Sequence, residues 1–116
     1  MIQKPNILIA GTGAIGGYFG AFLAVNKNLN VCFLARGKAL KHFKKNSLVI
    51  KSTIHKDIKV KINLSDKVSS FGKMFDYVFF CTKSKDTEPL MYELGKFVHV
   101  KTIITTLQNG FYNYRI

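Results

Sequence analysis

A glycine-rich hexapeptide near the amino terminus has the residue types and spacing that most directly indicate chemistry. Gly11-Thr12-Gly13-Ala14-Ile15-Gly16 follows the pattern G-x-G-x-x-G and stands between two apolar segments. In a strand–turn–helix setting the first glycine permits the tight turn, the second lets the backbone approach a pyrophosphate, and the third allows close helix–strand packing. The amino terminus of the helix then presents unpaired N–H groups to phosphates. The hexapeptide predicts a dinucleotide-binding loop, and the alternative is a glycine-rich turn that binds nothing.

The residues after the next apolar run bear on which dinucleotide is bound. A site for NAD usually places Asp or Glu there, where the carboxylate accepts hydrogen bonds from the ribose hydroxyls. This chain instead has Ala35, Arg36 and Gly37. A small residue followed by Arg leaves space and positive charge for a 2′-phosphate, so Arg36 predicts NADP (NADPH) as the cofactor. The alternative for Arg36 is an ordinary solvated surface residue.

A strand–helix–strand unit has to position these residues, and the first third of the chain predicts one. Asn6–Ala10 and Val31–Ala35 are short apolar runs of strand length, and Ala14–Val25 is apolar on every side, as in a helix buried against a sheet. Continuous apolar runs are typical of parallel strands that are covered on both faces. We therefore expect a right-handed βαβ unit with the glycine loop at its first turn.

The middle of the chain predicts a helix and then a hairpin. Lys38–Lys45 is amphipathic, and Asn46 follows as a candidate left-handed terminator. Apolar and polar residues alternate through Ile58–Leu64, which is typical of one half-exposed strand. We expect that strand to pair with Leu48–Lys51 in a lysine-faced hairpin inserted into the parallel pattern.

The last third returns to the alternation of strand and helix. Asp76–Thr82 is an apolar run typical of a buried strand. A helix is expected after it, with Pro89 in the first turn and apolar residues at helical spacing that continues to Val98. Thr102–Leu107 is the next expected strand, with Gln108-Asn109-Gly110 in the loop beyond it. The predicted fold class is α/β, a Rossmann-type open parallel sheet with an inserted β-hairpin. Its first strand should lie between the second strand and the Asp76–Thr82 strand, with Thr102–Leu107 outside the latter.

Length, charge and cysteine content narrow the class of protein. The 116 residues allow one domain, with 18 basic against 6 acidic side chains and a net charge of +12. Nearly all the basic residues are Lys, whereas nucleic-acid recognition favours Arg, so we expect no nucleic-acid partner. Cys32 and Cys81 lie in apolar runs and are expected to be core residues, and no metal site is predicted. Five glycines interrupt the uncharged stretch 5–26, so we expect no membrane-spanning helix and no membrane partner. Two cysteines are too few for a disulfide scaffold, so we expect a cytoplasmic protein.

Four segments together resemble the ketopantoate reductase (2-dehydropantoate 2-reductase) family in order and spacing. They are Gly11–Gly20 (GTGAIGGYFG), Phe33–Gly37 (FLARG), Asp76–Lys83 (DYVFFCTK) and Leu107–Gly110 (LQNG). The resemblance covers nearly the whole chain, and four linked motifs are more specific than the glycine loop alone. It implies an oxidoreductase that reduces 2-dehydropantoate, a small 2-oxo acid, to pantoate with NADPH in pantothenate biosynthesis.

The resemblance also implies roles for three residues outside the glycine loop. Arg36 matches the family's 2′-phosphate arginine, and Lys83 matches the lysine that the family uses at the cofactor, with Lys85 a less fitting stand-in. Asn109 matches the asparagine that lies between the nicotinamide ribose and the substrate. Both Lys83 and Asn109 follow predicted strands, at the sheet edge where open α/β sheets bind ligands.

The chain departs from the family beyond Gly110. Phe111–Ile116 replaces the family's usual small and acidic residues, and only Asn113 fits. The family's catalytic lysine belongs to a helical carboxyl-terminal domain with no counterpart in residues 1–116. We therefore expect one dinucleotide-binding domain, 1–116, with no catalytic residue of its own and no activity by itself. The alternative function is a non-catalytic nucleotide-binding or sensing module, and the oligomeric state is left open.

Overall fold

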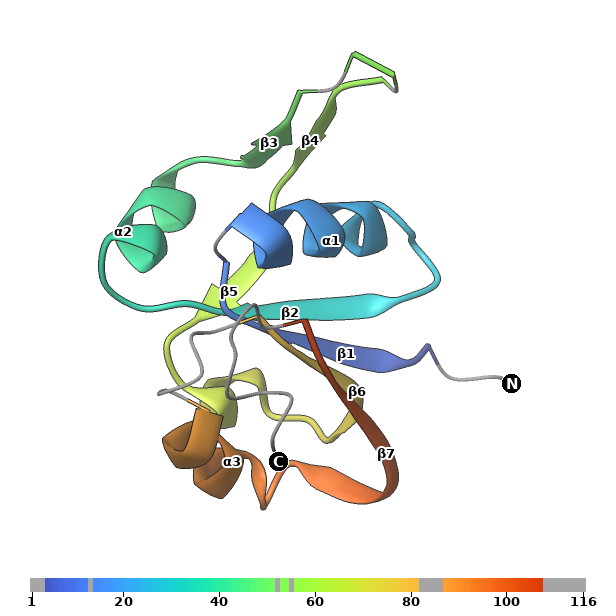
Figure 1. Cartoon of the computed structure of the whole chain (residues 1–116), viewed down its shortest axis with the longest axis vertical. Coiled ribbons are helices and arrows are strands. Elements are labelled where there is room, and N and C mark those ends of the chain that lie inside the picture. The colour runs from blue at the N-terminus through green and yellow to red at the C-terminus, as the bar shows by residue number, and fades with distance from the viewer. Residues whose placement is uncertain (1–3, 13, 52, 55, 82–86, 108–116) are drawn as a thin grey trace.

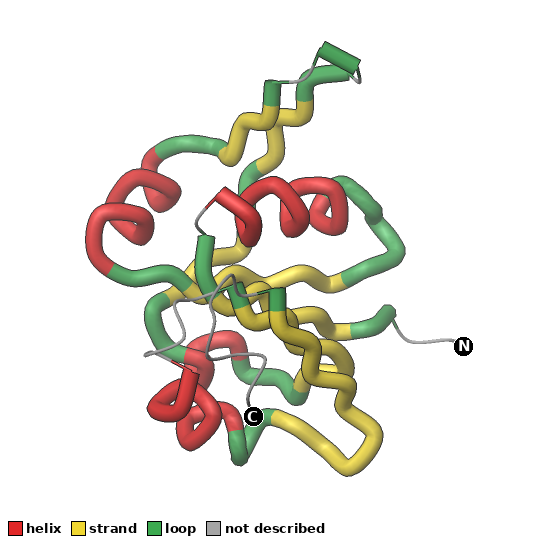
Figure 2. Tube along the Cα trace, viewed as in Figure 1, coloured by secondary structure: helices red, strands yellow, loops and turns green. Residues whose placement is uncertain are grey.

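The computed structural model describes residues 4–12, 14–51, 53–54, 56–81 and 87–107. A five-stranded parallel sheet forms the centre, with helix α1 and a small hairpin on one side and helix α3 with a 3-10 helix on the other (Figure 1). Strands and helices alternate along the chain except between α2 and the 3-10 helix, where three strands follow one another, and the first two of them form the hairpin (Figure 2). The expected α/β class and the parallel sheet are confirmed.

The first βαβ unit has nearly the predicted bounds. Strand β1 (Asn6–Ala10) leads to α1 (Ala14–Ala24) and then to β2 (Asn30–Leu34). The two strands pair in parallel from Asn6 opposite Asn30 to Ala10 opposite Leu34. Every residue of β1 after Asn6 is buried, as the continuous apolar run predicts for a central parallel strand.

The strand order is β5-β2-β1-β6-β7, which places β1 between β2 and β6 as expected. Strand β6 (Phe75–Phe80) pairs in parallel with both β1 and β7 (Val98–Thr106). Helix α3 (Thr87–Leu94) is shorter than the predicted helix, because Val98 already belongs to β7. The Phe97 carbonyl accepts a hydrogen bond from the Phe75 N–H, so pairing with β6 takes over where the apolar helical spacing alone predicts more helix.

The expected single strand over Ile58–Leu64 is wrong, because the structure divides it between two sheets. Strand β4 (Ile58–Val60) pairs antiparallel with β3 (Leu48–Ile50), whereas β5 (Asn63–Ser65) joins the main sheet in parallel with β2. The alternating apolar side chains nevertheless all pack on the same core, on the α1 side of the sheet: Ile58, Val60, Ile62 and Leu64. The alternation indicated the buried face correctly, but it could not indicate which strand would pair.

Helix α2 (Gly37–Lys45) is confirmed, but its predicted left-handed terminator is wrong. Asn46 has φ −127° and ψ 145°, an extended conformation. It ends the helix by a different means, since its backbone N–H and its side-chain Nδ2 both donate to the His42 carbonyl, at 3.0 and 2.9 Å. A side-chain amide that satisfies a terminal carbonyl removes the need for the left-handed turn.

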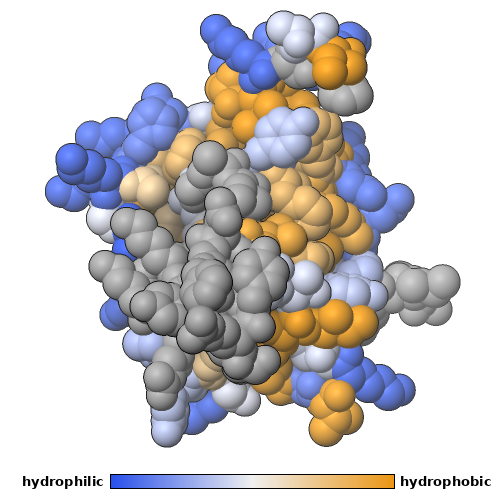
Figure 3. All heavy atoms as spheres, viewed as in Figure 1, coloured by the Kyte–Doolittle hydropathy of each residue, from blue (hydrophilic) through white to orange (hydrophobic). Residues whose placement is uncertain are grey.

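The core consists of two clusters, one on each face of the sheet. Alternate residues of β1 divide between them, with Leu8 and Ala10 facing α3 and Ile7 and Ile9 facing α1. Helix α1 packs so closely on the sheet that a Cβ at Gly20 would overlap the Phe33 ring. Figure 3 shows hydrophobic residues gathered near α1 and the base of the hairpin, hydrophilic residues over α2, and residues of both kinds at the hairpin tip.

Candidate functional site

The glycine loop begins at a turn that only glycine adopts readily. Gly11 directly follows β1 and has φ 109°, a conformation that L side chains rarely adopt. Its N–H donates to the Leu34 carbonyl at 2.9 Å, so the turn is tied to the carboxyl end of β2. Gly13 lies outside the described residues. The turn places the loop over the carboxyl ends of the central strands, where open α/β sheets bind ligands.

The third glycine of the motif brings the start of α1 against two strand ends. A Cβ at Gly16 would overlap the Gly11 carbonyl oxygen and would lie 2.9 Å from the Cβ of Cys81. The next residue is not restricted in this way, because a Cβ at Gly17 would meet nothing closer than 3.6 Å. At the start of α1 the close approach therefore occurs at Gly16 and not at Gly17, and it aims the helix terminus at the space above β1 and β6.

One hydroxyl group in the loop has no hydrogen-bond partner. Thr12 Oγ1 is fully buried, and among the described residues it is the one buried side-chain oxygen or nitrogen left unsatisfied. A buried hydroxyl without a partner costs about 1–3 kcal/mol. A hydroxyl group can donate to a phosphate oxygen, so Thr12 fits a loop whose polar groups are completed by a ligand.

The amino terminus of α1 is suited to an anion. The helix begins at Ala14, runs for 11 residues and has no acidic residue in its first turn. The first N–H groups of a helix have no partner within the helix and carry the positive end of its dipole. Ala14 and Ile15 can contribute these backbone groups, and their side chains lie outside the described part of the structure.

Arg36 follows β2 and directly precedes α2, at the same edge of the sheet. Its side chain is 64% exposed, and its Nη2 donates to Glu93 Oε2 at 3.0 Å. The other oxygen of Glu93 accepts from the Val68 N–H at 3.1 Å. Sequence reasoning missed Glu93, since its only signal was its place among a few acidic residues in a strongly basic chain. One nitrogen of the guanidinium is paired, and its other N–H groups can still donate to an anion.

The remaining predicted site residues lie outside the described residues. They are Gly13, Lys83, the weaker candidate Lys85, and Asn109. The structure does describe the strands that precede two of these segments, β6 and β7, and these pair in parallel up to Phe80 opposite Thr106. Strands β6 and β7 therefore end at the same edge of the sheet as the glycine loop.

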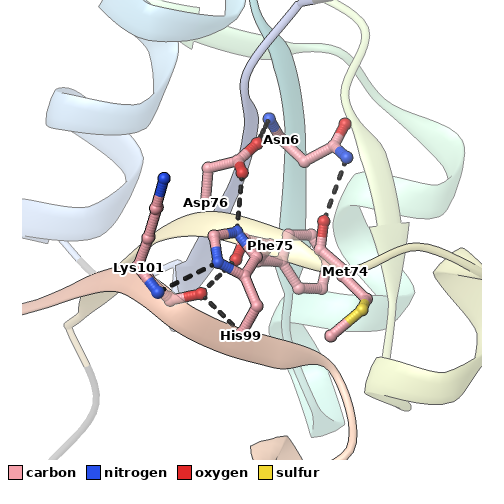
Figure 4. A network of polar contacts seen from close by, with 7 residues as sticks. Asn6, Met74, Phe75, Asp76, His99 and Lys101 are labelled. Atoms are coloured by element: carbon pink, nitrogen blue, oxygen red, sulfur yellow. Dashed lines mark hydrogen bonds and ion pairs between the residues drawn. The ribbon is translucent and has the colours of Figure 1, made fainter.

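A second polar cluster lies at the opposite, amino end of the sheet (Figure 4). Asp76 accepts from the Asn6 N–H at 2.8 Å through Oδ2, and its Oδ1 lies 2.9 Å from His99 Nε2. The Lys101 N–H donates to His99 Nδ1 at 3.1 Å. A backbone N–H can only donate, so Nδ1 is an acceptor here and Nε2 carries the proton toward Asp76. The cluster joins β1, β6 and β7, beside a hollow of about 540 Å³.

The ionisation of Asp76 reflects these contacts. The Asn6 backbone N–H, followed by the His99 side chain, lowers the pKa of Asp76 below its ordinary value. Hydrogen bonds to a carboxylate favour its charged form. The cluster is thus a set of polar groups that complete one another.

Both cysteines are suited to packing rather than to nucleophilic chemistry. Burial raises the pKa of Cys81 to about 11 and also raises the pKa of Cys32. A thiol with a raised pKa is protonated near neutral pH and is a poor nucleophile. No group of three or more His, Cys, Asp or Glu side chains lies together as metal ligands would within the described ranges. No helix of the described part is long and apolar enough to cross a membrane.

Taken together, the fold and the site define a class of protein. A parallel sheet with a glycine turn after its central strand and a close-packed helix behind that turn is a Rossmann-type fold. The sequence profile of the ketopantoate reductase PanE/ApbA family matches residues 7–116. The chain therefore belongs to the ketopantoate reductase family, a family of oxidoreductases, and the resemblance seen in the four motifs is confirmed.

Individual relatives agree with this assignment. An uncharacterised oxidoreductase of Bacillus subtilis, YkpB, is 30% identical over 109 residues, which cover 92% of this chain and 34% of YkpB. A 2-dehydropantoate 2-reductase of Mesorhizobium japonicum is 29% identical, over 90% of this chain and 31% of that protein. The solved 2-dehydropantoate 2-reductase of Porphyromonas gingivalis W83 matches with a TM-score of 0.76 and 30% identity, over 93% of this chain and 39% of that one. The chain spans about a third of the length of the curated relatives it matches.

Proposed function

We propose that residues 1–116 form the NADPH-binding domain of an oxidoreductase that reduces 2-dehydropantoate to pantoate. The observation that carries the proposal is the unsatisfied Thr12 hydroxyl in a loop that also offers the free amino terminus of α1. A pyrophosphate in that place would accept from the hydroxyl and from the helix N–H groups. The membership of the chain in the ketopantoate reductase family supports the same assignment.

The choice of NADPH over NADH rests on Arg36. Its exposed guanidinium stands at the carboxyl end of β2, where the ribose of a bound dinucleotide lies in this fold. No acidic residue occupies the positions from Ala35 to Lys38 to accept the hydroxyls of an NAD ribose. A charge-assisted contact with a 2′-phosphate contributes about 1.5–3 kcal/mol, or about one to two decades in affinity.

The binding proposal is tested by isothermal titration calorimetry, in which the purified chain is titrated separately with NADPH and with NADH. We expect NADPH to bind about 10- to 100-fold more tightly than NADH. Equal affinity for the two dinucleotides would contradict the role of Arg36. Failure to bind either one would contradict the proposal as a whole.

The residues of this chain would bind the cofactor and orient the substrate, and another domain would supply the general acid. NADPH, when bound, supplies the hydride for the ketone carbon. We assign to Lys83 a contact with the cofactor and to Asn109 the orientation of the 2-oxo acid by a hydrogen bond. An amide can donate a hydrogen bond but cannot protonate the developing alkoxide, so residues 1–116 have no assigned general acid.

Turnover is therefore expected to need more than residues 1–116. The test follows NADPH absorbance with ketopantoate, using chain purified free of host reductase. We expect NADPH binding without measurable reduction of ketopantoate. We expect activity to appear when the helical carboxyl-terminal domain of a family member is added as a separate protein. Robust activity of residues 1–116 that falls in Asn109→Ala would show that they already hold a complete site.

A further inference from the structure

One acidic side chain at the proposed cofactor site has no role in the function just described. Glu93 belongs to α3 and holds Arg36, the residue assigned to the 2′-phosphate. We propose that Glu93 is a specificity-determining residue that competes with the 2′-phosphate for Arg36 and so limits the preference for NADPH. This inference rests on the proposed function, because it concerns the same phosphate group.

The carboxylate of Glu93 is held in place by the fold. Its side chain is 32% exposed, and Oε1 accepts from the N–H of Val68, the first residue of the 3-10 helix Val68–Phe71. Lys67, which precedes that helix, provides no side-chain cap, so Glu93 satisfies a terminal N–H that has no other described acceptor. Leu90 and Leu94 on the same helix are buried in the core. The negative charge therefore has a fixed position.

Arg36 is the more adaptable member of the pair. Its side chain is twice as exposed as that of Glu93, and it makes no capping bond to α2. Guanidinium has five donors, and the Glu93 bond uses one nitrogen. An incoming phosphate must either share the guanidinium with a fixed carboxylate or draw Arg36 away from it. Both arrangements oppose the binding of a dianion, and neither affects a cofactor that lacks the 2′-phosphate.

The size of the effect follows from Coulomb's law. Repulsion between a dianion and a carboxylate placed about 6 Å apart in water lowers the binding constant about tenfold. Salt at physiological concentration reduces this to about threefold, because the charges are partly exposed. A role of Glu93 in positioning Arg36 would have the opposite sign, since loss of Glu93 would then weaken the binding of NADPH.

The test uses Glu93→Gln, which removes the charge and keeps an oxygen that can accept from Val68. We expect the affinity for NADPH to rise about three- to tenfold at low salt and the affinity for NADH to stay within twofold. The gain should shrink as salt is added. In an Arg36→Gln background the gain should be smaller but not zero, because competition for the guanidinium is lost while direct repulsion between the Glu93 carboxylate and the phosphate remains.

The matched control is Asp57→Asn, which removes one negative charge from the hairpin that extends away from α3 (Figure 1). We expect it to leave both affinities unchanged. Glu93→Met, of similar length and also uncharged, serves as the second variant should the first not fold. An unchanged or weaker affinity for NADPH in Glu93→Gln, with the preference over NADH intact in the parent chain, would overturn the role of Glu93 alone. Failure of the parent chain to bind NADPH would overturn this inference and the proposed function together.

Discussion

The polar groups at the two ends of the central sheet differ in whether their hydrogen bonds are satisfied. At the amino end, Asp76 has a partner for each carboxylate oxygen, and both nitrogens of His99 are engaged. At the carboxyl end, the Thr12 hydroxyl is buried without a partner, and Arg36 is mostly exposed with a single described partner. The same sheet therefore ends in a completed network on one side and an incomplete one on the other.

The difference separates structural polar groups from those that await a ligand. A polar cluster that satisfies itself contributes to stability and gains little by binding anything else. A loop that keeps a hydroxyl buried and unpaired is less stable than it could be, and the loss is recovered when a ligand accepts the hydrogen bond. The hollow beside Asp76 and His99 is thus a weaker candidate site than the glycine loop, although its residues are equally polar.

The largest expected effect is on the close packing at the carboxyl end. Gly16→Ala would force the start of α1 away from the Gly11 carbonyl, and we expect a loss of about 2–3 kcal/mol in the free energy of unfolding. The matched control is Gly17→Ala, which meets ordinary contacts and should be neutral or stabilising by about 1 kcal/mol. Urea unfolding of the two variants measures the difference. Equal stability would show that the approach at Gly16 is not tight.

The next effect concerns the exposed charge at the same end. Arg36→Gln should reduce the preference for NADPH over NADH by about 10- to 100-fold, because the charge-assisted contact with the 2′-phosphate is lost. Lys44→Gln, on the last turn of the same helix α2, is the control and should leave the preference unchanged. Competition binding of the two cofactors measures the ratio. A preference that survives in Arg36→Gln would assign the selection to another residue.

The unpaired hydroxyl provides a test in which stability and binding move in opposite directions. Thr12→Val removes the unsatisfied group, so we expect the chain without cofactor to gain about 1 kcal/mol in stability. The same change removes a donor to the pyrophosphate and should weaken the binding of NADPH by about fivefold. Thermal unfolding and titration of one preparation measure both. A loss of stability in Thr12→Val would mean that the hydroxyl has a partner and that the two ends are alike.

The smallest effect is expected at the amino end and depends on pH. Asp76→Asn should cost about 1 kcal/mol at pH 7, because partial exposure lets water replace some of the lost hydrogen bonding. The pKa of Asp76 is lowered in the folded chain, so its stabilisation is complete above the ordinary value of about 3.9 and is lost as the pH falls through the lower folded value.

Denaturant unfolding between pH 7 and pH 2 measures this dependence. The parent chain should lose stability as the pH falls below about 4, and Asp76→Asn should lose less over the same range. Asp66→Asn, at an exposed position after β5, is the control and should change stability by no more than about 0.5 kcal/mol. Identical acid limbs in the parent and in Asp76→Asn would remove Asp76 from the stabilising network.

Local sequence patterns predicted the glycine turn and four of the five strands of the parallel sheet, in the order β2-β1-β6-β7. The apolar run Asn6–Ala10, the glycine spacing and the second apolar run each depend on residues close in the chain, so the βαβ unit could be read directly from them. The packing role of Gly16 follows from the same motif. These features depend on periodicity and backbone freedom, which a short stretch of sequence records in full.

Only the tertiary structure decided which groups became partners. The alternation through Ile58–Leu64 indicated one buried face, but the change of pairing after Val60 depends on where β2 and β3 lie in space. Arg36 and Glu93 are 57 residues apart, and Asp76 and His99 are 23 apart. No local pattern encodes contacts between residues so far apart in the sequence, because they form only when separate strands and helices pack together. The sequence therefore determined where the site lies, and the folded chain decided which of its charges are already paired.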